Sequence, residues 1–136
     1  KVINYKDNKT TGIYFVTLFD YQTTPKVVFD FNSNESGPSG GLMLSLTIYN
    51  KLINENINKG LRIVGTGTID KKGNVGSIGG VEYKLKGAVS AKGDIFFTPL
   101  GENYDDAMKF KKKYHYNIKI VGIATFDDAL KYLSNL

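Results

Sequence analysis

A serine in a glycine-rich segment is the first group in this chain that could do covalent chemistry. Ser39 lies within Gly37-Pro38-Ser39-Gly40-Gly41, immediately before an apolar run that begins at Leu42. If that run is a helix, its first backbone N–H groups and the positive end of its dipole lie beside the serine hydroxyl. An oxyanion formed during acyl transfer needs such donors. The same pattern also fits a serine that only caps the helix, and the local sequence by itself favours the cap.

A nucleophilic serine needs a base, and the sequence offers a lysine for this role. Residues 81–92 follow a Gly-Gly pair and carry apolar side chains at helical spacing. Lys84 falls within that apolar stripe, whereas Lys86 falls on the polar side. A lysine ordinarily titrates near ~10.4 and becomes a base only where burial or a helix N-terminus destabilises the cation. The alternative, which the residues alone favour, is that Lys84 extends along the apolar face to water. The stripe consists of Val81, Leu85, Ala88 and Ala91.

The sequence also contains the residues of a second possible catalytic arrangement, the serine, histidine and aspartate of a histidine-based hydrolase. Residues 37–41 formally match the G-x-S-x-G nucleophile motif, which would combine Ser39 with Asp105 and His115. That motif follows directly on a strand, whereas the apolar run before it ends well upstream, and Pro38 is an awkward neighbour in so strained a turn. His115 lies between two tyrosines at the end of a lysine-rich segment, which is typical of a surface residue. We therefore interpret the match as accidental.

The remaining motifs give no indication of a nucleotide or metal site. The segment Gly65-Thr66-Gly67-Thr68-Ile69-Asp70 begins like a dinucleotide fingerprint, but Asp70 stands where the third glycine is needed. The chain contains no G-x-x-x-x-G-K-[ST] phosphate loop. It has no cysteine and one histidine, which excludes thiolate sites and argues against a zinc centre. We therefore expect no cofactor and no metal.

Composition and charge are those of a globular domain. The 136 residues are 41% hydrophobic and 23% charged, enough for one domain with its own core. The net charge of +5 comes from scattered lysines, with Arg62 the only arginine, which indicates a solvated lysine-rich face rather than a nucleic-acid groove. The chain has no apolar run of the ~18 residues that a membrane span needs. It begins at Lys1, and we expect it to be a fragment or processed form of a longer protein.

The elements that would position Ser39 and Lys84 alternate between strands and helices in the second half of the chain. The apolar side chains of residues 42–53 project around nearly the whole circumference at helical spacing, which predicts a helix buried on all sides. Residues 61–70 predict a strand that turns at 71–74 and returns through 75–78. We therefore expect one α+β domain of α/β-like character, with a mixed sheet and packed helices. Further strands are predicted at 12–21, 26–31, 94–98 and 117–123, and helices at 81–92, 104–114 and 126–133, the last capped by Thr125.

Three glycine-containing blocks give the chain a resemblance to a known family. Their order and spacing resemble the proteolytic domain of Lon-type proteases, from about Val27 to the C-terminus. The likeness is greatest to the bacterial membrane-anchored PDZ–Lon proteases, which lack the ATPase module of other Lon proteins. The resemblance implies an α+β domain with a mixed sheet. The blocks are Gly37-Pro38-Ser39-Gly40-Gly41-Leu42-Met43, then Gly65-Thr66-Gly67-Thr68-Ile69-Asp70 with Gly73-Asn74-Val75, then Ile78-Gly79-Gly80 with Lys84.

The resemblance also implies a role for each site residue. Ser39 would be the nucleophile and Lys84 its general base, while Thr66 would hydrogen-bond within this pair and help to hold the lysine. Backbone N–H groups of the serine loop would bind the oxyanion. The implied reaction is ATP-independent hydrolysis of peptide bonds in unfolded proteins or peptides, through an acyl-enzyme and with no metal or nucleotide. The competing hypothesis is a catalytically silent domain that binds peptides or partner proteins. The loop residues concerned are Gly37, Pro38 and Gly40.

Two positions depart from the family pattern, and the family implies parts outside this sequence. Gly40 replaces the alanine that is usual after the serine, and Ser36 stands where ATP-dependent Lon proteins carry aspartate. The relatives imply an upstream PDZ domain and membrane segment, a protease domain outside the cytoplasmic membrane, and self-association. The substrate is not indicated by any motif. By their place in the chain, we expect Asn103, Tyr104 and the polar loop 32–36 near the cleft.

Overall fold

The computed structural model describes residues 3–5, 8–10, 23–28 and 37–136. The chain forms two units, Lys1–Asp30 and Phe31–Leu136, which are described separately. In the first unit, β1 (Ile3–Tyr5) pairs antiparallel with β2 (Asn8–Thr10). The strand predicted at 12–21 lies outside the described residues, as do residues 29–31 of the strand predicted at 26–31. Residues 26–28 of the latter are not in a strand.

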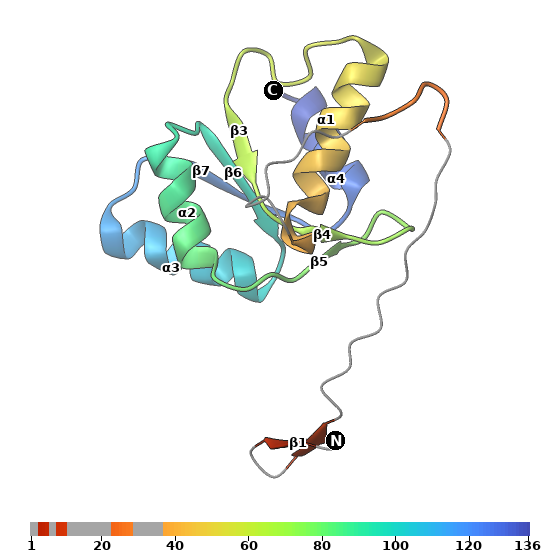
Figure 1. Ribbon diagram of the computed structural model, residues 1–136. Coiled ribbons are helices and arrows are strands. Elements are labelled where there is room, and N and C mark those ends of the chain that lie inside the picture. Colours follow the sequence, from red (N-terminus) through yellow and green to blue (C-terminus); the bar gives the residue numbers. More distant parts are fainter. Residues whose placement is uncertain (1–2, 6–7, 11–22, 29–36) are drawn as a thin grey trace. The chain divides into compact units, whose positions relative to one another are not determined.

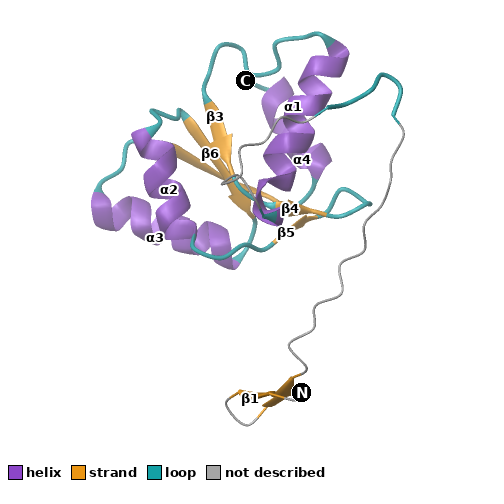
Figure 2. Cartoon of the chain, in the orientation of Figure 1, coloured by secondary structure: helices purple, strands orange, loops and turns teal. Residues whose placement is uncertain are grey.

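Ten elements make up the described part of the second unit, and strands alternate with helices along most of it (Figures 1 and 2). A short 3₁₀ turn, η1, runs directly into the first helix. Most predicted elements are present, with bounds that differ by a few residues. The elements are η1 (Pro38–Gly40), α1 (Gly41–Ile53), β3 (Ile63–Gly65), β4 (Thr68–Ile69), β5 (Val75–Gly76), α2 (Val81–Ser90), β6 (Ile95–Pro99), α3 (Glu102–Tyr114), β7 (Lys119–Ile123) and α4 (Phe126–Ser134).

A parallel sheet forms the middle layer of this unit. Its strand order is β3-β6-β7, with Ile63 opposite Ile95 and Ile95 opposite Lys119. The helices α2 and α3 cross over between successive strands and cover one face, while α1 and α4 cover the other (Figure 1). The hairpin β4–β5 is antiparallel and separate from this sheet. The predicted fold class, a single α/β-like domain with mixed strand pairing and packed helices, is confirmed.

The central strand β6 divides the core into two clusters. Ile95 and Phe97 face α1 and α4, whereas Phe96 faces α2 and α3, because successive side chains of a strand point to opposite faces. All five residues of β6 are buried. A strand covered on both faces has a continuous apolar run rather than an alternating one, which is how residues 95–97 appear in the sequence.

Two expectations about the elements were wrong. In α1 only Leu42 and Leu46 are buried, and Leu52 is 53% exposed, so the helix is not buried on all sides. It covers one face of a sheet, and its far side has no layer of described residues to pack against. The strand predicted at 61–70 is two strands, because the chain leaves the sheet after Gly65 and pairs again in the β4–β5 hairpin. The apolar stripe of α2 is correct for three residues, but Ala91 lies beyond the helix and is exposed.

Helix ends account for several of the polar residues. The predicted cap at Thr125 is confirmed, because its side chain accepts from Asp128 N while the Asp128 carboxylate accepts from Thr125 N. In α3, acidic residues lie in the first turn and Lys111–Lys113 in the last, which complements the helix dipole.

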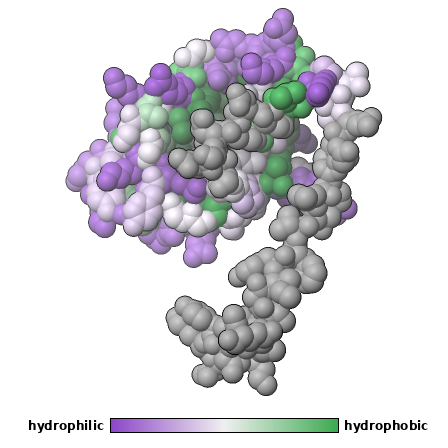
Figure 3. Space-filling model, in the orientation of Figure 1, coloured by the Kyte–Doolittle hydropathy of each residue, from purple (hydrophilic) through white to green (hydrophobic). Residues whose placement is uncertain are grey.

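The part of the surface formed by α2 and α3 is mostly hydrophilic (Figure 3). Over the residues that are described, no helix is long and apolar enough to cross a membrane.

Candidate active site

The structure brings Ser39 and Lys84 together from two different elements. Ser39 lies in η1, just before α1, and Lys84 lies in the first turns of α2. The Lys84 Nζ atom donates to Ser39 Oγ at 3.0 Å, and both side chains are partly buried. This distance is within the range in which an amine and a hydroxyl exchange a proton. We call Ser39 and Lys84 the dyad.

The rotation of α2 directs Lys84 toward the serine. Val81, Leu85 and Ala88 are buried against the sheet, which fixes the side of the helix that faces inward. The helix begins after Gly80, whose φ of +68° lies in the left-handed region that glycine adopts without strain. The Lys84 N–H closes the first turn by donating to the Gly80 carbonyl at 3.2 Å. The lysine is therefore on an ordered turn at the edge of the buried stripe.

The segment that connects β3 to β4 holds the serine loop through hydrogen bonds. The Ser39 carbonyl accepts two hydrogen bonds, from Thr66 Oγ1 at 3.0 Å and from Gly67 N at 2.7 Å. Thr66 is itself 3% exposed, and its N–H donates to the Phe97 carbonyl in β6. The sequence resemblance implied that Thr66 hydrogen-bonds within the pair and helps to hold the lysine. Its hydroxyl binds the backbone of Ser39, rather than the amine of Lys84.

Two glycines allow α1 to approach this break closely. A Cβ atom on Gly65 would lie 2.7 Å from Met43 Sδ and 2.8 Å from Phe97 Cβ. A Cβ atom on Gly67 would lie 2.8 Å from Val75 Cγ1. Either contact is shorter than van der Waals packing permits, so a side chain at these positions would push the helix away. The two glycines that resemble the start of a dinucleotide fingerprint therefore allow close packing next to the serine loop.

The backbone amides around the serine hydroxyl differ in whether they already have an acceptor. Gly41 N donates to the Pro38 carbonyl and Leu42 N to the Gly67 carbonyl, so these two amides are engaged. Proline has no N–H. Gly40 N–H belongs to the 3₁₀ turn η1, whose i→i+3 bonding pairs it with the Gly37 carbonyl. Among the described residues, no backbone carbonyl accepts from Ser39 N–H, so this amide of the predicted loop is available to an oxyanion.

Sequence comparison assigns the domain to a family. Residues 30–135 match the Lon protease (S16) C-terminal proteolytic domain. The chain belongs to this family of serine peptidases. It is also 30% identical over 118 residues to the Lon protease of Campylobacter jejuni, a match that covers 86% of this chain. The chain spans 14% of the length of that relative.

The alternative triad is not assembled in this Lon domain. Asp105 lies in the first turn of α3 and His115 follows its last residue. Ten residues of helix separate them by about 15 Å along the axis, which the two side chains cannot bridge. Both side chains are exposed. The histidine takes a left-handed conformation with φ of +54° and ends the helix, which is a structural role.

Asn103 contacts the segment that leads into the lysine helix. Its Nδ2 atom donates to the Ile78 carbonyl at 2.9 Å, and its Oδ1 atom accepts from Ile78 N at 3.0 Å. Tyr104 instead packs over Gly122 of β7, where a Cβ atom would lie 3.2 Å from its ring. Residues 32–36, with Ser36, lie outside the described residues. The sequence indicated no partner for Asn103, since only the fold brings it to Ile78.

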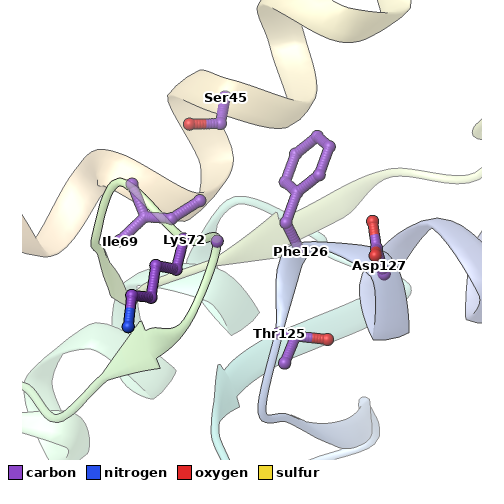
Figure 4. Close-up of a pocket in the computed structure, with 7 residues that line it drawn as sticks. Ser45, Ile69, Lys72, Thr125, Phe126 and Asp127 are labelled. Atoms are coloured by element: carbon purple, nitrogen blue, oxygen red, sulfur yellow. The ribbon is translucent and has the colours of Figure 1, made fainter.

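A pocket of about 400 Å³ lies apart from the dyad, between α1, the β4–β5 hairpin and the start of α4 (Figure 4). Its polar groups do not converge, because the Lys72 amine and the Asp127 carboxylate point away from each other. Neither dyad residue lines it. Among the described residues, no three neighbouring His, Cys, Asp or Glu side chains form a group that could hold a metal ion. Among the described residues, the dyad places a hydroxyl nucleophile and an amine base in direct contact.

Proposed function

We propose that this domain is a serine endopeptidase that hydrolyses peptide bonds through the Ser39–Lys84 dyad. The 3.0 Å contact between Lys84 Nζ and Ser39 Oγ supports this most directly. It occurs in a domain of the Lon protease family, at the serine and lysine that the sequence motifs indicate. The hydrogen bonds that hold the serine loop also support the proposal, because a nucleophile must be held in place while it attacks.

The chemistry proceeds in two halves. In the first, Ser39 Oγ bonds to the scissile carbonyl carbon while its proton passes to the neutral amine of Lys84. The amide of Ser39 donates to the resulting oxyanion. The C–N bond then breaks as the Lys84 ammonium gives its proton to the leaving amine. In the second half, water adds to the ester and loses a proton to Lys84, and the ester bond breaks as that proton returns to Ser39 Oγ.

The proposal includes independence from ATP and a preference for unfolded chains. No step of this mechanism consumes a nucleotide, and the sequence has no phosphate loop. Because Ser39 is partly buried, a scissile carbonyl reaches it only on an extended segment of substrate. The substrates are therefore unfolded proteins and peptides rather than folded domains.

The proposed setting of the domain follows from the sequence resemblance. Likeness to the PDZ–Lon proteases supports a full-length protein that is anchored in the cytoplasmic membrane, with a PDZ domain and with the protease domain outside the cytoplasm. Likeness to the Lon proteases likewise supports self-association of this domain. Membrane fractionation of the full-length protein, followed by external protease digestion of intact spheroplasts, tests the location. Sedimentation of this chain tests the self-association.

Cleavage of an unfolded protein in the absence of ATP tests the proposed function. The comparison uses the parent chain and its Ser39→Ala, Lys84→Ala and His115→Ala variants. Lys86→Ala is the matched control, because Lys86 is an exposed lysine two residues away on the same helix. We expect cleavage by the parent, His115→Ala and Lys86→Ala, and none by the other two. Cleavage that survives Lys84→Ala, or that disappears with His115→Ala, would contradict the proposal. A parent that binds unfolded peptides without cleaving them would support the catalytically silent alternative.

A further inference from the structure

One side chain satisfies both backbone groups of a residue that precedes the lysine helix. The amide of Asn103 accepts from Ile78 N at 3.0 Å and donates to the Ile78 carbonyl at 2.9 Å. We call this pair of bonds the Asn103–Ile78 clamp. Both bonds are partly buried, and they connect residues 25 apart in sequence. Such a bidentate pair fixes the orientation as well as the position of the peptide that it holds.

The two residues between the clamp and α2 have no side chains to hold them. Gly79 and Gly80 are exposed, and a Cβ atom placed on Gly79 would meet no atom within 4 Å. Ser77, before the clamp, is exposed as well. The buried residues of α2 set the rotation of the helix, and the Ile78 side chain packs against the same core cluster. The clamp adds two directional bonds that fix the Ile78 peptide from which the chain enters α2.

The other side of the clamp is firmly anchored. Asn103 lies in the first turn of α3, and the next residue, Tyr104, packs its ring against Gly122 of β7. The same turn is closed by Asp105 N, which donates to the Gly101 carbonyl at 3.0 Å. A connected path thus runs from the sheet through Tyr104 and Asn103 to Ile78, and from there to Lys84.

We propose that Asn103 is a positioning residue for Lys84, which rests on the function proposed above. The serine half of the dyad is held by Thr66 and Gly67, and the lysine half is held by the clamp. Losing the clamp lets the start of α2 move relative to the serine loop. A misplacement of about 1 Å between reacting groups can lower a rate by about 100-fold. Binding of the substrate does not depend on the lysine amine, so the loss falls on kcat rather than on KM.

The test compares Asn103→Ala with a variant that loses a similar bond elsewhere. Thr125→Ala is the matched control, because Thr125 also pairs a side chain with backbone at a helix start, but in α4. Asn103→Asp is the second variant, since it keeps the acceptor for Ile78 N and loses the donor for the Ile78 carbonyl. Peptide hydrolysis gives kcat and KM for each protein. The NMR signal of the Lys84 side-chain Cε, assigned by its absence in Lys84→Ala, reports the surroundings of the amine without any need for activity.

We expect kcat to fall at least tenfold in both Asn103 variants, with KM within threefold of the parent, and the Lys84 signal to move toward that of an exposed lysine. Thr125→Ala is expected to keep both the parent kcat and the parent signal. An unchanged kcat and Lys84 signal in Asn103→Ala, or an equal loss in Thr125→Ala, would overturn the role of Asn103. If the parent itself cleaves nothing, the proposed function fails, and the Lys84 signal alone then decides whether the clamp places the lysine.

Discussion

Replacing Thr66 with valine tests how much the hydrogen bond that supports the serine loop contributes to catalysis. The change removes the hydroxyl that donates to the Ser39 carbonyl at 3.0 Å and leaves a side chain of similar shape. The carbonyl is not left unpaired, because Gly67 N still donates to it at 2.7 Å. The substitution therefore removes one of two bonds without exposing or orphaning a buried group.

The expected size of the effect follows from that one bond. A net hydrogen bond contributes about 1 kcal/mol, so the free energy of unfolding should fall by about that amount and Tm by about 4 °C. Only the part of this bond that is stronger in the transition state than in the resting enzyme raises the barrier to acylation, so the rise is no more than about 1 kcal/mol. That corresponds to a decrease of at most about fivefold in kcat.

The assay is peptide hydrolysis at a temperature where both proteins are fully folded by circular dichroism. Thr47→Val is the control, because the Thr47 hydroxyl also donates to a backbone carbonyl, that of Met43 at 2.8 Å, on an exposed turn of α1. We expect its kcat to equal that of the parent. A loss of 1000-fold or more in Thr66→Val would show that Thr66 acts on the reacting groups directly, and would refute this reasoning.

Three further outcomes are expected. Gly40→Ala should keep activity and raise the free energy of unfolding by about 0.5 kcal/mol, because Gly40 has helical backbone angles and open space around its Cα, and a thermal melt with a peptide assay measures both. Gly65→Ala should lower the free energy of unfolding by about 1–3 kcal/mol in denaturant titrations, because its Cβ would lie 2.8 Å from Phe97 Cβ. The pKa of the Asp70 carboxyl lies below its ordinary value of 3.8, mainly because the Asn74 side chain donates to it. The stabilisation that comes from this lowered pKa is present above 3.8 and is lost as pH falls through the folded value. Tm measured between pH 7 and pH 3 should therefore fall less in Asp70→Asn than in the parent.

The dyad could be predicted from sequence because each half has a local signature. Ser39 precedes an apolar helix within a glycine-rich segment, and Lys84 interrupts an apolar stripe at helical spacing. Each signature also fits a structural role, a helix cap for Ser39 and a side chain that extends to water for Lys84, and the local residues alone favoured these roles. Only the combination with the Gly65–Asp70 block, through its likeness to Lon proteases, decided between them.

The features that could not be predicted depend on contacts between distant segments. The break after Gly65 arises where β3 leaves β6 and the chain passes under α1, and residues 61–70 alone have a continuous strand pattern. The exposed side of α1 depends on how many layers cover it, which hydropathy along one helix does not determine. The bonds from Asn103 to Ile78 join residues 25 apart, so no local pattern indicates them.

Site-mapped labelling with a fluorophosphonate tests the central claim most directly, because the reagent reacts with serine only when its hydroxyl is activated. Mass spectrometry of the labelled parent identifies the modified residue, and the rate of labelling is compared with that of Lys84→Met. We predict a single adduct on Ser39 and a rate at least 100-fold lower in Lys84→Met, with Lys86→Met unchanged. An adduct on another residue, or a labelling rate that does not depend on Lys84, would contradict the dyad.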